Sequence, residues 1–327
     1  MPHPLSLVMP TNLVVAFHTV PSADWFEAAL RTIGRFYRFV SLDEVIGLVS
    51  GSRRFNSACH VTFDDGHRSF SEIAVPILRR LSIPATLFVS PRVIEERTPY
   101  WFQELTAYRA TLGDDPIRAV LAEHLSCAVQ QLGPFPVNSV LLCLPIDDIR
   151  GVLEEVRRRH RLERPASENV TVDELRRLAT SGLVTVGGHT MDHPVLGNES
   201  GERARAEIQE SVAALARMID RPVTSFAYPN GTEGFDFGPR EQDVLRGAGV
   251  QIAFSTDPGF VGQRTNPYAV PRGGCPSLEG EPESRTVSRL LLLPVWQHLS
   301  RLRARSRPTE AEERARIRAL SPALHTR

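Results

Sequence analysis

Two short motifs hold the residues of this chain that are best suited to chemistry. Asp64 and Asp65 are adjacent in the segment 61–66 (VTFDDG), and His189 and His193 are four positions apart in HTMDHP. One carboxylate with two imidazoles is a common ligand set for a divalent metal, and three protein ligands leave room for water. The remaining carboxylate is available as a base. A metal that binds water beside a base that accepts its proton is the minimal arrangement for hydrolysis.

Six short apolar runs predict buried strands, and helical patterns separate them. These runs are residues 13–17, 59–63, 85–89, 183–186, 225–228 and 252–255. Alternation of strands and helices with short links favours an α/β fold with a parallel sheet. His18, the Asp64 and Asp65 pair, His189 and Asn230 all come just after predicted strands. Strand ends of a parallel barrel share one rim, so we expect these residues to be neighbours in space.

The chain divides into three parts by its pattern. Residues 12–283 are predicted to form a catalytic barrel, with a helical insertion at 98–168 where the strand and helix rhythm is interrupted. Residues 284–327 form an Arg-rich tail with helical character. We expect the tail to pack on the barrel, and contact with a membrane surface is the alternative.

Composition limits the partners of this protein. The 327 residues are 42% apolar and 23% charged, which is typical of a globular protein with a sizeable core. Basic and acidic residues number 38 each, so the net charge favours neither nucleic acid nor an anionic membrane. The four cysteines form no CxxC pair and are expected to be thiols. The N-terminal segment lacks the basic region of a secretion signal, and no apolar run is long enough for a membrane span, so a cytoplasmic protein is expected.

Three motifs in this order resemble the polysaccharide deacetylases of carbohydrate esterase family four, which carry the NodB-homology domain. They are TFDDG at 62–66, HTMDHP at 189–194 and FAYPNG at 226–231, each after a predicted strand. The resemblance covers roughly residues 12–275 apart from the insertion. It implies a distorted (β/α) barrel with about seven parallel strands. It also implies removal of acyl groups, mostly acetyl, from sugars.

The resemblance assigns roles to five residues. It implies that Asp65, His189 and His193 bind a divalent metal, most often zinc, with cobalt, nickel and iron as alternatives. Asp64 would be the general base. The backbone N–H of Asn230 matches the family's donor to the oxyanion that develops during acyl transfer.

The sequence departs from the family pattern at two places. Many members have an arginine that holds the base carboxylate where this chain has Ala227. Arg272, in VPRGG after the last predicted strand, is our candidate for that role, and a surface arginine is the alternative. Most members take their general acid from a C-terminal His-Asp motif, which is absent here. Some exopolysaccharide deacetylases are circularly permuted so that this histidine comes first, and Phe-His-Thr around His18 resembles that form. His18 is therefore assigned as the general acid, with His298 as the alternative.

The sequence thus predicts a metal-dependent hydrolase that removes N-acetyl groups from a carbohydrate and releases acetate. The substrate is expected to be an N-acetylated glycan, a glycolipid or a small glycoside. A sugar N-deformylase or another non-peptide amidase would use the same site, and a non-catalytic carbohydrate-binding protein would retain the scaffold. A mononuclear iron oxygenase also uses two histidines and a carboxylate. Such enzymes have antiparallel sandwiches, which the parallel rhythm of this chain disfavours.

Overall fold

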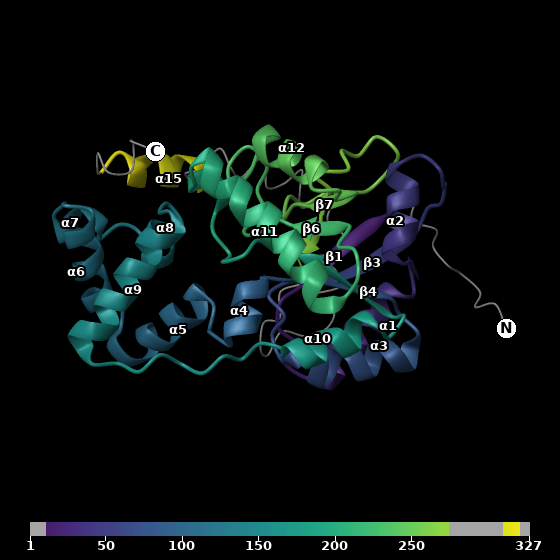
Figure 1. Cartoon of the computed structure of the whole chain (residues 1–327), viewed down its shortest axis with the longest axis horizontal. Helices are drawn as coiled ribbons and strands as arrows, with labels where there is room; N and C mark the ends of the chain where they lie inside the picture. Colours follow the sequence, from purple (N-terminus) through teal and green to yellow (C-terminus); the bar gives the residue numbers. More distant parts are fainter. Residues whose placement is uncertain (1–10, 275–309, 321–327) are drawn as a thin grey trace.

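Parallel strands build one curved sheet, which is the frame of the molecule. The structure is a computed structural model that describes residues 11–274 and 310–320. Within these residues an eight-stranded sheet has the order β7-β6-β5-β4-β3-β1-β8, and β2 pairs with β3 off this path. Every strand pairing is parallel. The sheet curls and helices flank it, so the predicted α/β fold, a distorted (β/α) barrel, is confirmed (Figure 1).

The strands are short and buried, and helices join most of them. The strands are β1 Leu13–Phe17, β2 Arg38–Phe39, β3 Ala58–Phe63, β4 Ala85–Val89, β5 Val184–Gly188, β6 Ser225–Ala227, β7 Ile252–Phe254 and β8 Gly273–Gly274. The helices that accompany the barrel are α1 Ala23–Ile33, α2 Leu42–Val49, η1 Phe70–Ala74, α3 Val75–Leu81, α4 Pro91–Glu96, α10 Val172–Ala179, η2 Leu196–Asn198, α11 Gly201–Ile219 and α12 Pro239–Gly247. The remaining helices are α5 Trp101–Leu112, α6 Asp115–His124, α7 Val129–Leu132, α8 Val137–Leu141, α9 Ile146–His160 and α15 Glu310–Arg318.

The last strand segment brings the two edges of the sheet together. Phe254 of β7 forms a parallel bridge with Val270, and β8 begins three residues later and pairs with β1. Residues 270–274 therefore lie between β7 and β1. Arg272 lies within this stretch, and its side chain is buried.

Side chains alternate along the strands between two cores, as the period of two in a β-strand requires. On β1, Val15 and Phe17 belong to the cluster that packs under the outer helices, whereas Val14 belongs to a second cluster. The second cluster also contains Phe88, Phe254 and apolar residues of α2.

The region 98–168 is helical, and it has a hydrophobic cluster of its own. Helices α5 to α9 gather beside the barrel in Figure 1, and α15 lies next to them. Ile317 of α15 is buried in the cluster of these helices. Arg314 of α15 forms a buried ion pair with Asp236 of the barrel, with 2.5 Å between Nη1 and Oδ1. Helix α15 therefore touches both the insertion and the barrel.

The rest of the C-terminal tail, including His298 and the apolar run at 290–296, lies outside the described residues. Among the helices of the described part, none combines the length and the apolar content needed to cross a bilayer.

A buried histidine gives the fold a defined pH dependence. His60 of β3 is fully buried, with 2.8 Å between its Nδ1 and the carbonyl oxygen of Val40 and 2.9 Å between its Nε2 and Oγ1 of Thr86. A carbonyl only accepts, so Nδ1 carries the proton and Nε2 accepts from the Thr86 hydroxyl. Burial lowers the pKa of His60 from 6.5 to about 4. Below pH 6.5 the unfolded chain therefore binds a proton that the folded protein does not.

We expect the free energy of unfolding to decrease as the pH falls from 6.5 to about 4. This histidine alone contributes a slope that approaches about 1.4 kcal/mol per pH unit. Urea unfolding at several pH values measures the slope in the wild type and in His60→Gln, which should lose this component. His160→Gln, at an exposed position of α9, is the matched control and should keep it. An unchanged slope in His60→Gln would show that His60 is not the responsible group.

Candidate active site

The carboxyl ends of the strands meet at one rim, and the residues that follow them line a common pocket. His18 follows β1, Asp64 and Asp65 follow β3, and His189 follows β5. The pocket has a volume of about 380 Å³. Its lining comprises His18, Asp64, Asp65, His189, His193, Asn230 and Thr256 from the barrel and Trp101, Phe102, Asn138 and Leu142 from the insertion region. The structure thus brings together the residues that the sequence analysis placed on the rim.

The turn after β3 directs the two adjacent carboxylates to different partners. Asp64 continues the strand, and its N–H donates to the carbonyl of Phe17 at 2.9 Å. Asp65 then has a φ of 67° and Gly66 a φ of 68°, so the chain bends sharply at this point. As a result Asp64 faces Arg272, whereas Asp65 faces His189 and His193.

Gly66 is required by both its backbone conformation and its surroundings. A Cβ atom at this position would lie 2.8 Å from Cγ1 of Val89 and 3.3 Å from Cγ2 of Val170. A left-handed φ costs a residue with a Cβ about 1–2 kcal/mol, and the contact with Val89 adds to that cost. Gly66→Ala should therefore lower the free energy of unfolding by about 2 kcal/mol or more, as measured by urea denaturation.

Gly151 in helix α9 provides the matched control for this substitution. It is exposed, and no heavy atom lies within 4 Å of where its Cβ would be. Gly151→Ala should raise stability by roughly 0.5–1 kcal/mol, because alanine is the better helix former. Equal effects of the two substitutions would argue against the described turn.

Asp65, His189 and His193 form a buried cluster whose geometry fits a divalent cation. Oδ1 of Asp65 lies 3.5 Å from Nε2 of His189 and 3.3 Å from Nε2 of His193. Ligand atoms about 2.0–2.2 Å from one tetrahedral ion lie about 3.3–3.6 Å apart. The same Oδ1 is buried and accepts no hydrogen bond from the described residues, which is costly for a carboxylate oxygen unless a cation compensates. Within the described residues this is the one group of three such side chains that could hold a metal.

The carboxylate and the two imidazoles of this cluster shift one another's pKa. Burial alone would raise the pKa of Asp65, but the adjacent imidazoles of His189 and His193 hold it well below its usual range. Burial lowers the pKa of His193. Burial acts in the same direction on His189, but the carboxylates of Asp65 and Asp64 outweigh it and raise the pKa of His189. Nδ1 of His189 lies 2.7 Å from the carbonyl oxygen of Ala227, and since a carbonyl only accepts, this nitrogen carries the proton. In the neutral ring Nε2 then carries the lone pair that a metal ligand requires.

Arg272 lies directly behind Asp64. Its Nη1 and Nη2 donate to Oδ1 and Oδ2 of Asp64, both at 2.8 Å, in a two-pronged ion pair. Nε donates to the carbonyl of Ser255 at 2.9 Å, and Nη1 also lies 3.2 Å from Oγ1 of Thr62. Burial alone would raise the pKa of Asp64, but the charge of Arg272 and the nearby histidines lower it. Asp64 is therefore ionised and fixed in orientation.

His18 and Asn230 also line the pocket. Nε2 of His18 is 3.8 Å from Oδ2 of Asp64, and the His18 side chain is 58% exposed, so it is accessible to a bound molecule. Asn230 has a φ of 60°, and its carbonyl accepts a hydrogen bond from the Thr256 hydroxyl. Its backbone N–H donates to no group in the described part of the chain. The amide is therefore available to an incoming oxygen.

The residues that the insertion region adds to the pocket could not be predicted from the sequence. Phe102 of α5, Asn138 of α8 and the nearby Leu142 line the pocket wall, yet no local pattern marks them. The role of Thr190 was not predicted either, although this residue is part of the HTMDHP motif. Its hydroxyl accepts a hydrogen bond from the N–H of His193 at 3.0 Å. A hydroxyl beside a motif histidine is a signal that could have been used.

The model of one protein family matches residues 55–252, which is more than half of the chain, and its description is polysaccharide deacetylase. The chain belongs to the polysaccharide deacetylase family. The matched segment includes all three motifs, whereas His18 and Arg272 lie outside it. Membership in the polysaccharide deacetylases supports carbohydrate de-N-acetylation. No curated protein matches this sequence.

Several solved structures share the fold of this polysaccharide deacetylase. IcaB from Ammonifex degensii aligns with a TM-score of 0.58 and 18% identity over 86% of this chain and 97% of its own. The deacetylase PplD from Streptococcus pyogenes, in complex with acetate, aligns with a TM-score of 0.53 and 14% identity over 86% and 96%. The BpsB deacetylase domain from Bordetella bronchiseptica aligns with a TM-score of 0.51 and 17% identity over 81% and 96%.

Proposed function

We propose that this protein is a divalent-metal-dependent hydrolase that removes N-acetyl groups from a carbohydrate. The observation that carries the proposal is the buried Asp65, His189 and His193 cluster next to an ionised, arginine-held Asp64. Both lie in a pocket that His18 and other rim residues line. This arrangement combines a metal-ligand set with a separate base, which is what amide hydrolysis by water needs.

The proposed ligands of the metal are Asp65, His189 and His193, and we propose zinc as the metal, with cobalt, nickel and iron as alternatives. A bound divalent cation supplies Lewis acidity and lowers the pKa of water. Asp64 accepts the proton of the attacking water, because Arg272 keeps it ionised and directs it into the site. The new C–O bond forms at the amide carbonyl carbon, and the carbonyl oxygen gains charge.

Two further residues complete the proposed reaction. The N–H of Asn230, which has no acceptor among the described residues, donates to the developing oxyanion, an interaction that typically contributes about 10²–10³ in rate. His18 donates a proton to the sugar nitrogen as the C–N bond breaks, because an amine leaves poorly as an anion. The products are acetate and the free amino sugar. The accessible imidazole of His18, 3.8 Å from Asp64, supports this assignment.

A screen for acetate release over N-acetylated glycans and glycosides, combined with metal analysis of the purified full-length protein, tests the proposal. We expect about one divalent metal per chain and acetate release that a chelator abolishes and added metal restores. Formate release from N-formyl sugars without acetate release would identify an N-deformylase instead. Metal-free protein that binds glycans without turnover would identify a carbohydrate-binding protein.

A further inference from the structure

The two histidines of the cluster are held in different ways. A hydrogen bond to Ala227 fixes the ring of His189, whereas Nδ1 of His193 is buried without a hydrogen-bond partner in the described structure. The ring of His193 packs edge-on against Tyr100 and Phe102, with centroid distances of 5.4 and 5.1 Å. These contacts limit the rotation of the His193 ring, but they do not fix the direction of its nitrogen lone pairs. The direction of Nε2 of His193 therefore depends on the backbone that carries it.

That backbone is strained and needs outside support. Thr190 and His193 have φ values of 63° and 60°, and each left-handed residue with a Cβ costs about 1–2 kcal/mol. Glu207 of α11 accepts the N–H groups of Met191 and Asp192 on Oε2, at 2.9 and 3.0 Å. From the other side, Nε1 of Trp101 donates to the carbonyl of His193 at 3.1 Å.

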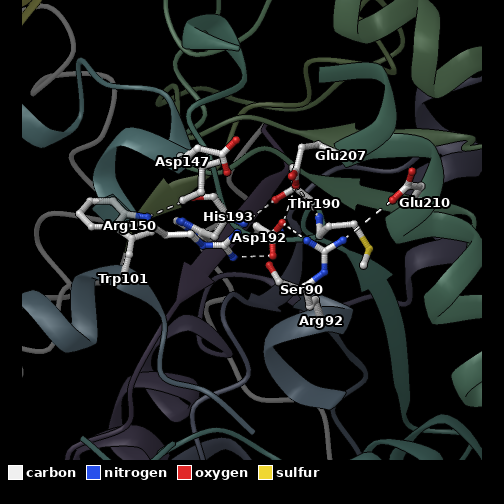
Figure 2. A network of polar contacts seen from close by, with 12 residues as sticks. Ser90, Arg92, Trp101, Asp147, Arg150, Thr190, Asp192, His193, Glu207 and Glu210 are labelled. Carbon is white, nitrogen blue, oxygen red and sulfur yellow. Dashed lines mark hydrogen bonds and ion pairs between the residues drawn. The ribbon is translucent and has the colours of Figure 1, made fainter. Parts of the chain in front are cut away.

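Asp192, the residue just before His193, anchors the loop through its side chain. This side chain is completely buried, and it forms ion pairs with three arginines. Figure 2 shows two of them, Arg92 and Arg150, beside Asp192. Nη1 of Arg92 lies 2.6 Å and Nη2 of Arg203 lies 3.2 Å from Oδ2, and Nη2 of Arg150 lies 2.7 Å from Oδ1. Because these hydrogen bonds are charge-assisted, a shift of the carboxylate would break several strong contacts at once.

The three arginines come from three different elements. Arg92 belongs to α4 and Arg203 to α11, both of which accompany the barrel, whereas Arg150 belongs to α9 in the insertion. The insertion thus contacts the residue next to a proposed metal ligand through Arg150, and the ligand itself through Trp101. Trp101 and His193 both line the pocket, whereas Arg150 and Asp192 lie outside its lining.

We propose that Asp192 and its three arginines are a positioning cluster that fixes His193 for the metal, and that Arg150 makes the helical insertion part of the metal site. This inference rests on the proposed function, since it takes His193 as a metal ligand. Asp192 is a positioning residue, because it acts through the backbone of His193 and contacts no ligand atom. The insertion then supports the chemistry as well as shaping the pocket wall.

Metal binding by the full-length protein tests this inference without any substrate. The affinity for Co²⁺ is measured by competition with a chromophoric chelator, and the Co²⁺ absorption spectrum reports the coordination geometry. Arg150→Met should weaken Co²⁺ binding by about tenfold and change the spectrum, since outer partners of metal ligands typically contribute 10–100-fold in affinity. Arg150→Lys retains the charge and should restore part of the affinity.

Arg159→Met is the matched control in the same helix. Arg159 forms ion pairs with Glu123 and Glu155 and has no contact with Asp192, so its removal should leave Co²⁺ affinity and spectrum unchanged. Asp192→Asn should weaken binding more than Arg150→Met does. Should Asp192→Asn fail to fold, Arg92→Met replaces it, because two arginines then still neutralise the carboxylate.

Two results would overturn the inference, and they have different meanings. If the wild type binds Co²⁺ and Arg150→Met and Arg92→Met bind it equally well with the same spectrum, the cluster only stabilises the fold. This holds even if the melting temperature falls. If the wild type binds no divalent cation, the proposed metal site itself is wrong, and the positioning role is lost with it.

Discussion

Asp64→Asn is expected to retain the metal and lose about 10²–10⁴-fold in turnover, the usual contribution of a general base. The substitution keeps the shape of the side chain but removes the charge that accepts a proton from water. Arg272 would still find one oxygen at position 64, so the pocket should keep its outline. Acetate release under saturating substrate, with metal content measured on the same sample, gives the comparison with the wild type.

Asp65→Asn is the matched control, because it makes the same chemical change at the adjacent residue. Oδ1 of Asp65 lies within 3.5 Å of Nε2 of both histidines, so this variant should lose the metal itself. The two variants thus separate loss of the base from loss of the metal. Wild-type turnover in metal-loaded Asp64→Asn would exclude Asp64 as the base.

The strand ends explain why much of the site could be predicted from the sequence. Buried strands appear in a sequence as short apolar runs. A parallel barrel brings the residues that follow these strands to one rim. His18 and His189 are 171 positions apart in the numbering, yet both line the same pocket. The topology alone joins them. The turn at Asp65 and Gly66 was also foreseeable, since two adjacent carboxylates need a bend to face different partners.

Some strands, one helix and the contacts of the insertion were not predicted from the sequence. Strand β2 and strand β8 are two residues long, so neither shows an alternating pattern. Helix α2 was not predicted. Ser41 and Glu44 form a capping box at its start, and this spacing is a sequence signal for the beginning of a helix. The contact between Arg150 of the insertion and Asp192 could not be predicted from the sequence, because it depends on how two separate hydrophobic cores pack together.

The place of Arg272 shows how one ion pair can replace another in the same scaffold. The position where the resemblance expects an arginine is Ala227 of β6, and the backbone carbonyl of that residue accepts a hydrogen bond from Nδ1 of His189. Arg272 reaches Asp64 from the segment that lies between β7 and β1. Since a barrel surrounds its interior, a guanidinium can approach the same carboxylate from several strands.

Arg272→Met is expected to lower the free energy of unfolding by about 3–5 kcal/mol at neutral pH, because it leaves a buried carboxylate without its partner. Without this charge, burial should raise the pKa of Asp64, which the guanidinium now holds below 3.8. In the unfolded chain Asp64 keeps its ordinary pKa. The deficit in unfolding free energy of the variant relative to the wild type should therefore shrink as the pH falls and Asp64 takes up a proton. The same shift should move the acid limb of kcat/KM to higher pH.

Urea unfolding between pH 4 and pH 8, with a chelator present so that metal does not add stability, measures this deficit. Arg158→Met removes an exposed arginine that pairs with Glu155 and should leave stability nearly unchanged at every pH. A deficit for Arg272→Met that does not vary with pH would mean that Arg272 stabilises the barrel through its contacts with Phe88, Phe254 and Ser255 alone. A deficit that follows the protonation of Asp64 would tie the stability of the barrel to the charge state of its proposed base.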